Sequence, residues 1–418
     1  MMTAKPNSLA RSLPPTITTD PLKDFGDTVL NVMQRRLNLN LQGDAKQLFQ
    51  LPLRDGGVGF CSPSETTPYA FIAGLASSCL AVRVSNLNAD DNKGSVGSGW
   101  LLEELKKCLC RYITPQTGWP DEEPFINGVQ HFVGHFSEVG KRKRSERLQA
   151  TLVGHYRAGR RMYVKEHFES KESIARMESR ANKGSALIWK TYPLTQEFAL
   201  TDEEMRFSVA YATGQSLPHM PELCSCAGKE PLTIEHTVNC AEKLTRHNML
   251  QSRFVTFARL HGVTTRQNPR LTYQDAKEKL EPDVIFYPGV HEPVQTDITV
   301  VNSCAPSILK RGREAHKWAT NERRARKRLK YLHNATLRGE LFRPLIFETH
   351  GKISEEVDTT LDMLASRTTM DKGLAKTDMK LDLAITLARG NALAARNTIA
   401  WAQRARDKAR AIHPVAAT

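Results

Sequence analysis

The 418-residue sequence has no run of about 18 to 20 consecutive apolar residues, the length that a membrane-spanning helix needs. Its longest apolar candidate, YAFIAGLASSCLAV, is short and rich in small residues, so we expect a buried helix there and no membrane partner. The N-terminal segment also lacks the apolar core of a secretory signal. These absences favour an intracellular, reducing location, where the eight cysteines suit metal binding or core packing better than disulfides.

Acidic residues are in the minority, with 45 Asp and Glu against 59 Lys and Arg, and the net charge is +14. The excess is concentrated in KRKR (141 to 144), RAGRR (157 to 161) and the segment 310 to 330. Clustered positive charge favours a polyanionic partner such as DNA, because each neutralised phosphate releases counterions. Solvated helix faces would explain part of these runs without any partner. The run GKRKRSER could also act as a nuclear import signal, so we expect a nuclear protein.

The patterning predicts an α+β fold with a mostly helical N-terminal half, a zinc knuckle, a small α/β core and a helical C-terminal tail. In the first half, glycines 56 and 57 permit a tight turn within LPLRDGGVGF. In the tail, two amphipathic helices are expected, split near Gly390. The expected segments are a disordered N-terminus (1–21), a first helical region (22–85), a basic helical linker (86–200), the knuckle region (201–265), the α/β core (266–350) and the tail (351–418).

A polymerase core is not recognisable. The sequence NADD places Asp90 and Asp91 side by side, as a polymerase does with its paired aspartates. That motif needs an aromatic residue two positions before the first aspartate and a hairpin of apolar strands around the pair, and both are lacking. We therefore do not assign a polymerase role to Asp90 or Asp91.

A group of potential zinc ligands follows a helix that a capping box at Thr201 and a glycine at 214 delimit. The stretch LCSCAGKEPLTIEHTVNC supplies three cysteines and one histidine, Cys224, Cys226, His236 and Cys240. Three thiolates and one imidazole make up a closed tetrahedral zinc site, with one ligand pair on a turn and the other on a helix. The alternative is a set of buried free cysteines.

Two aspartates fall on what the sequence predicts to be a β-hairpin, EPDVIFYPGVHEPVQTDITVVN (281 to 302). Pro282 can only open a strand or lie at its edge, so Asp283 marks a strand start. In the second strand, Asp297 lies on the face opposite Ile298 and Val300. Two carboxylates at neighbouring strands can share one hard cation such as Mg²⁺. Alternatively, Asp283 is a turn residue and Asp297 a surface acid paired with arginine.

Pro-Asp followed by a second acid on a β-hairpin is the arrangement of Mg²⁺-dependent nucleases of the restriction-enzyme type. Those enzymes place a lysine two residues after the second acid, where this sequence has Thr299. A basic helix within 313–332 offers Lys327 and Lys330 instead. We expect the apolar face of that helix to consist of Ala315, Trp318, Ala319, Ala325, Leu329 and Leu332.

The order of these features resembles the C-terminal region of non-LTR, site-specific retrotransposon reverse transcriptase polyproteins that carry a restriction-like endonuclease. In that family a Cys-Cys-His-Cys knuckle precedes Lys/Arg-Pro-Asp, a second acid and a Lys-x-x-Lys-Tyr segment. The knuckle, Asp283, Asp297 and KRLKY (327–331) match, whereas Glu281 replaces the basic residue before the proline. The resemblance implies that the segment 22–85 is a thumb-like remnant, that 266–350 is a restriction-like endonuclease core, and that target DNA is nicked.

The leading hypothesis is therefore a Mg²⁺-dependent DNA endonuclease without a polymerase core. Asp283 and Asp297 would hold the metal, and Lys327 or Lys330 would stabilise the charge that develops on the phosphate. The residues expected to contact nucleic acid, DNA or retroelement RNA, are Arg246, His247, Arg323 and Arg324. The rival hypothesis is a catalytically dead remnant that binds DNA or RNA through its zinc knuckle. A third is a helical scaffold whose tail contacts other proteins.

Overall fold

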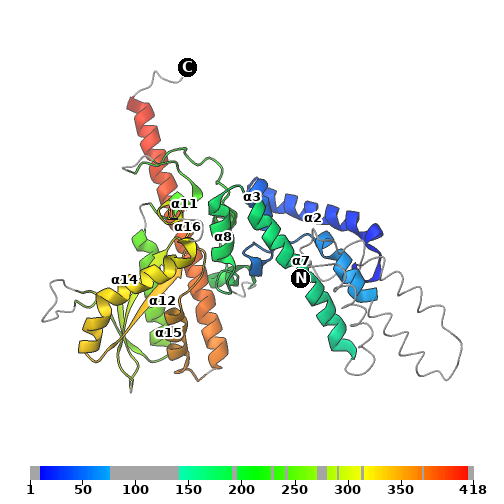
Figure 1. Ribbon diagram of the computed structural model, residues 1–418. Coiled ribbons are helices and arrows are strands. Elements are labelled where there is room, and N and C mark those ends of the chain that lie inside the picture. Colours follow the sequence, from blue (N-terminus) through cyan, green and yellow to red (C-terminus); the bar gives the residue numbers. More distant parts are fainter. Residues whose placement is uncertain are drawn as a thin grey trace. The chain divides into compact units, whose positions relative to one another are not determined.

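The computed structural model describes residues 10–75, 141–190, 195–226, 230–240, 243–270, 280–289, 291–311, 315–369 and 371–412 (Figure 1). Asp90, Asp91 and most of the predicted linker lie outside these ranges. The chain divides into two compact units, one of residues 1–35 and 60–168, the other of residues 36–59 and 169–418. The predicted boundary at residue 85 therefore does not separate them. No helix in the described ranges is long and apolar enough to cross a membrane.

The described part of the first unit is helical. It contains most of α2 (Pro15–Leu37), the short helix η2 (Pro63–Glu65) and α7 (Lys141–His167). Arg160 of α7 forms a half-buried ion pair with Glu65, and the ring of Tyr156 lies 5.0 Å from that of Tyr69. The prediction of disorder over residues 1–21 is wrong for residues 15–21. They form the first turns of α2, which continues through Pro21.

The second unit contains a four-stranded mixed sheet in the order β1-β2-β3-β4. Strands β1 (Thr264–Gln267), β2 (Val284–Tyr287) and β3 (Val294–Val301) pair antiparallel, which confirms the predicted hairpin. Strand β4 (Leu341–Glu348) pairs parallel to β3 along its whole length, after the crossover helix α14 (Ala315–Leu337). Because β2 pairs only with Val294–Thr296, the second half of β3 extends beyond it.

Helices cover both faces of this sheet (Figure 1). On one face, α12 (Lys243–Leu260), α15 (Glu355–Ala365) and α16 (Lys372–Ile412) enclose a core that includes Phe254, Phe286 and Phe347. The even-numbered residues of β3, Val294, Ile298 and Val300, point into it, as the alternation predicted. The odd-numbered positions face α14, as the contact of Val301 with Ala319 shows. The fold is thus α+β, with a helical C-terminal tail as predicted.

Further helices surround this sheet and its covering layers. They are α3 (Gly43–Gln50), η1 (Leu53–Asp55), α8 (Lys171–Arg180), α9 (Leu187–Lys190), η4 (Gln196–Phe198), α10 (Asp202–Thr213), α11 (Ile234–Thr237) and α13 (Pro306–Leu309). The predicted capping box at Thr201 and the end of α10 at Gly214 are both confirmed. The predicted turn is also present, since Gly56 has φ +91° and the Arg180 guanidinium donates to the Gly56 and Gly57 carbonyls at 3.1 and 3.0 Å.

The apolar face predicted for α14 is wrong except at Ala319, which is buried beside Val301. Trp318 is 64% exposed and Leu329 88%, whereas Tyr331 and Ala335, which pack near Phe342, are buried. The side of α14 that faces the sheet must carry polar groups, because Asp297 and Glu348 of the sheet point toward this helix. The polar side of α14 therefore faces inward, and part of its apolar side faces solvent.

The predicted break of the tail near Gly390 is also wrong. Helix α16 runs without interruption from Lys372 to Ile412. A Cβ atom at position 390 would lie 2.9 Å from Cγ of Arg246, so the glycine allows α12 and α16 to approach closely. Its role is in helix packing, and the helix tolerates it.

Candidate functional site

Asp283 lies where β2 leaves β3. Its main chain still follows the ladder, with its N–H donating to the Thr296 carbonyl at 2.9 Å. Beyond this point β2 no longer pairs with β3, and the Asp283 carboxylate takes over the role of a pairing strand, because its Oδ2 accepts the N–H of Ile298 at 2.5 Å. The predicted strand start is confirmed. The side chain is positioned beside the peptide bond that joins Asp297 to Ile298.

Asp297 lies on the α14 face of β3, and its side chain is only 6% exposed. Its Oδ1 contacts the Lys327 Nζ at 2.7 Å and accepts a hydrogen bond from the Thr299 hydroxyl at 3.2 Å. The alternative of a surface acid paired with arginine is therefore wrong. A buried carboxylate needs such partners, because desolvation without them costs free energy.

Lys327 comes from the inward side of α14, four residues before the buried Tyr331. Its ammonium group thus reaches the acid from a different element than the strand position of Thr299. Lys330 does not share this arrangement. It is exposed, and its Nζ lies 5.2 Å from the centroid of the Tyr331 ring. Of the two candidate lysines, the structure brings Lys327 to Asp297.

His247 also belongs to this group, although the sequence analysis assigned it to nucleic-acid contact. It lies in the second turn of α12, with its Nε2 3.2 Å from Oδ1 of Asp283. The hydrogen bond to Asp283 raises the pKa of His247 above its ordinary value, and the charge of Asp297 acts in the same direction. Nothing in local spacing links residue 247 to residue 283, so only the fold could reveal the pair.

The four predicted zinc ligands converge. Cys224 and Cys226 lie on the turn before Pro231, His236 lies in α11, and Cys240 follows that helix. The Sγ atoms of Cys224 and Cys240 are 3.5 Å apart, Cys226 Sγ is 3.7 Å from His236 Nε2, and all four ligand atoms lie within 4.8 Å of one another. This cluster, hereafter the Cys₃His cluster, could hold zinc.

The surroundings of the Cys₃His cluster suit a cation. Burial raises the pKa of the Cys240 thiol to about 12, and the neighbouring thiols add to the shift, so protons are held tightly. A coordinated metal reverses this preference, because a thiol that binds it loses its proton. His236 Nδ1 is 3.1 Å from Oε2 of Glu230, the carboxylate contact that fixes the ring orientation of many metal-bound histidines.

The three arginines expected to contact nucleic acid lie in different environments. Arg246 is 3% exposed, and its guanidinium donates to Asn391 at 2.6 Å, so it is not on the surface. The buried position of Arg246 does not support its expected contact with nucleic acid. Arg324 is ion-paired with Glu356. Arg323 is exposed and has no ion-pair partner among the described residues.

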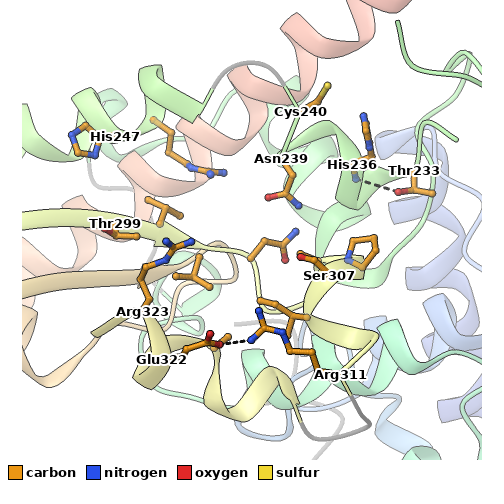
Figure 2. Close-up of a pocket in the computed structure, with 18 of the residues that line it drawn as sticks. Thr233, His236, Asn239, Cys240, His247, Thr299, Ser307, Arg311, Glu322 and Arg323 are labelled. Atoms are coloured by element: carbon orange, nitrogen blue, oxygen red, sulfur yellow. Dashed lines mark hydrogen bonds and ion pairs between the residues drawn. The ribbon is translucent and has the colours of Figure 1, made fainter. Parts of the chain in front are cut away.

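A cavity of about 970 Å³, hereafter the β3 groove, runs along the part of β3 that extends beyond β2. Figure 2 shows His247 and Thr299 at one end and His236 and Cys240 at another, with Arg323 on the α14 side. Neither aspartate lines it, but His247 and Thr299, which contact the two aspartates, do. The groove therefore connects the surroundings of both acids with the Cys₃His cluster.

In the described part of the chain, one further group of ligand-type residues converges, Glu235, Cys304 and His350, and it is fully buried. The aspartates with His247 do not form a third group of this tightness. No protein-family model matches the chain, and no curated protein matches it in sequence.

Proposed function

We propose that this protein is a Mg²⁺-dependent endonuclease that nicks DNA by phosphodiester hydrolysis. The observation that carries the proposal is the contact of Lys327 Nζ with Oδ1 of Asp297 at 2.7 Å. A lysine two residues after the second acid is typical of restriction-type nucleases, and here a lysine from α14 supplies the ammonium where the strand offers Thr299. Its charge would stabilise the negative charge that develops on the phosphate under attack.

The proposal assigns to the two acids a magnesium ion of the kind that keeps several waters. Such an ion needs only one or two carboxylates together with substrate phosphate oxygens, and both contacts that fix Asp297 use the same oxygen, Oδ1. Asp283 and Asp297 would hold Mg²⁺, which when bound polarises the phosphate and activates a water molecule. His247 would keep Asp283 oriented, and Thr299 would do the same for Asp297.

The order of elements supports the restriction-like part of this proposal. A helix, three antiparallel strands, a crossover helix and a fourth strand parallel to the third surround the acids. The Cys₃His cluster, proposed here to bind zinc with a structural role, precedes this core as it does in site-specific retrotransposon proteins. We infer from these features a retrotransposon-derived nuclease that acts in the nucleus.

A second candidate is a remnant that binds nucleic acid without cutting it. One observation favours it: both carboxylate oxygens of Asp283 already have partners inside the protein, His247 and the Ile298 N–H. These contacts would suffice if Asp283 only terminated a strand pair. The two candidates differ in the response of DNA cleavage to Mg²⁺.

The test is nicking of supercoiled plasmid by the full chain over a range of Mg²⁺ concentrations. Asp297→Asn and Lys327→Ala should each lower nicking at least about 100-fold, the order of loss expected when a charge-stabilising group is removed. The matched control is Lys372→Ala, an exposed lysine in the first turn of α16 outside the groove, which should stay within about threefold of the parent. Nicking that survives in Asp297→Asn, or that needs no divalent ion, would sink the nuclease assignment.

A further inference from the structure

The outer face of α14 combines exposed apolar side chains with positive charge. The helix contains seven Lys and Arg residues against one Glu. Trp318 is 64% exposed, Leu329 is 88% exposed, and Leu332 is 45% exposed. Most of the Trp318 side chain is therefore not covered by the residues that the structure describes.

This face adjoins the β3 groove. Trp318, Glu322 and Arg326 follow one another at intervals of four residues, so the three side chains share one side of the helix. Glu322 and Arg326 both line the groove, so Trp318 lies one turn beyond the edge of the groove on the same side of the helix. Arg323, also in the lining, lies one turn before Lys327, on the side that leads to Asp297.

The charges that remain for a ligand are positive. Lys327, Arg324 and Arg328 are bound to Asp297 or Glu356, and Glu322 is shared between Arg311 and Arg326 at 2.5 Å each. Arg323 and Lys330 have no ion-pair partner among the described residues, and the shared carboxylate leaves one net positive charge. The surface thus complements a polyanion.

We propose that this face binds a single strand of nucleic acid, with the indole of Trp318 stacked on a base and with Arg323, Arg326 and Lys330 contacting phosphates. The proposal rests on the nuclease function only in that the strand would continue along the groove toward Asp297. A duplex suits this surface less well, because its base faces are covered by neighbouring pairs. Unpaired bases offer the flat faces that aromatic side chains stack on.

The length of the surface fixes the expected site size. Leu329 follows Trp318 by eleven positions, which corresponds to about 16 Å along a helix. At about 3.4 Å per nucleotide of a strand, this distance spans about five nucleotides. Affinity for oligothymidylate should therefore rise steeply up to about five nucleotides and change little beyond ten.

The experiment measures fluorescence anisotropy of labelled dT10 and of a ten-base-pair duplex with the full chain in Mg²⁺-free buffer. Trp318→Ala should weaken dT10 binding by about 5- to 150-fold, the range that loss of one stacked base gives. Trp318→Phe, which keeps a ring, should stay within about threefold of the parent. The matched control is Trp401→Ala, since Trp401 is an exposed tryptophan on α16, and it should not change dT10 affinity.

Equal dT10 affinity in Trp318→Ala and the parent would overturn the proposal, as would tighter binding of the duplex. A change of oligomeric state in Trp318→Ala with dT10 affinity intact would overturn it too, because the face would then be a protein interface. Circular dichroism of each variant checks that it is folded. Because binding is measured without Mg²⁺, a parent that binds dT10 but nicks no plasmid contradicts the nuclease and leaves this surface supported.

Discussion

The buried ion pair between Arg176 of α8 and Glu235 of α11 gives a prediction that does not depend on function. The two side chains are 4% and 6% exposed, and Arg176 Nε lies 3.1 Å from Oε1 of Glu235. Removing one partner leaves the other charge without compensation in the core, at a cost of about 3 to 5 kcal/mol. Arg176→Met and Glu235→Leu should therefore each lower the free energy of unfolding by about that amount.

The double variant Arg176→Met/Glu235→Leu should recover most of this loss, because no charge is then left unpaired. The assay is urea-induced unfolding of the full chain at one zinc concentration, with bound zinc counted to check the Cys₃His cluster. Arg36→Met is the control. Its partner Asp202 is 2.9 Å away, but both side chains are more than 70% exposed, so the cost should stay below about 1 kcal/mol. If the double variant is as unstable as the sum of the singles, the charge argument fails.

Three further predictions concern packing, pH and metal. Gly390→Ala should lower the free energy of unfolding by about 1 to 3 kcal/mol, since its Cβ would meet Arg246 at 2.9 Å. Gly373→Ala, in the exposed first turn of α16, should not lower it. Urea-induced unfolding of the two variants measures both values. Burial holds the pKa of His350 well below its ordinary value, so the contribution of His350 to stability is present above about pH 6.5 and is lost as the pH falls toward the lowered pKa. The free energy of unfolding should therefore fall by about 1.4 kcal/mol per pH unit in this range. If that free energy depends on pH no more steeply in the parent than in His350→Gln, the prediction is contradicted. The purified chain should hold one zinc ion, and Cys240→Ser should lower both its zinc content and its thermal midpoint; an unchanged midpoint after zinc loss would exclude a structural role.

Features encoded by neighbouring residues were predictable from the sequence. The hairpin around residues 283 to 297, the helix that follows it and the Cys₃His cluster each depend on turn residues, alternation or ligand spacing. The candidate site was predictable to the same extent. Asp283 and Asp297 come from one hairpin, so the sequence could place them on adjacent strands.

Features decided by tertiary packing were not. The spacing of apolar residues in α14 indicates an apolar face, but it does not indicate whether the sheet that the helix covers is polar. Here the ion pair with Asp297 holds Lys327 on the inward side, and Trp318 faces solvent. Gly390 could equally have ended a helix or allowed two helices to touch. The pairing of His247 with Asp283 joins residues 36 positions apart, and no local pattern encodes it.

The length of α16 constrains how the second unit can respond to a ligand. Its first half, with Met379, Leu383 and Leu387, belongs to the core beneath the sheet, and near its far end Ala402 packs beside Cys224. One continuous helix thus contacts both the sheet core and the Cys₃His cluster, so a change in the distance between them would require this helix to bend or to shift in its packing. A ligand long enough to reach from the sheet to the Cys₃His cluster would therefore meet two places that one unbroken helix connects.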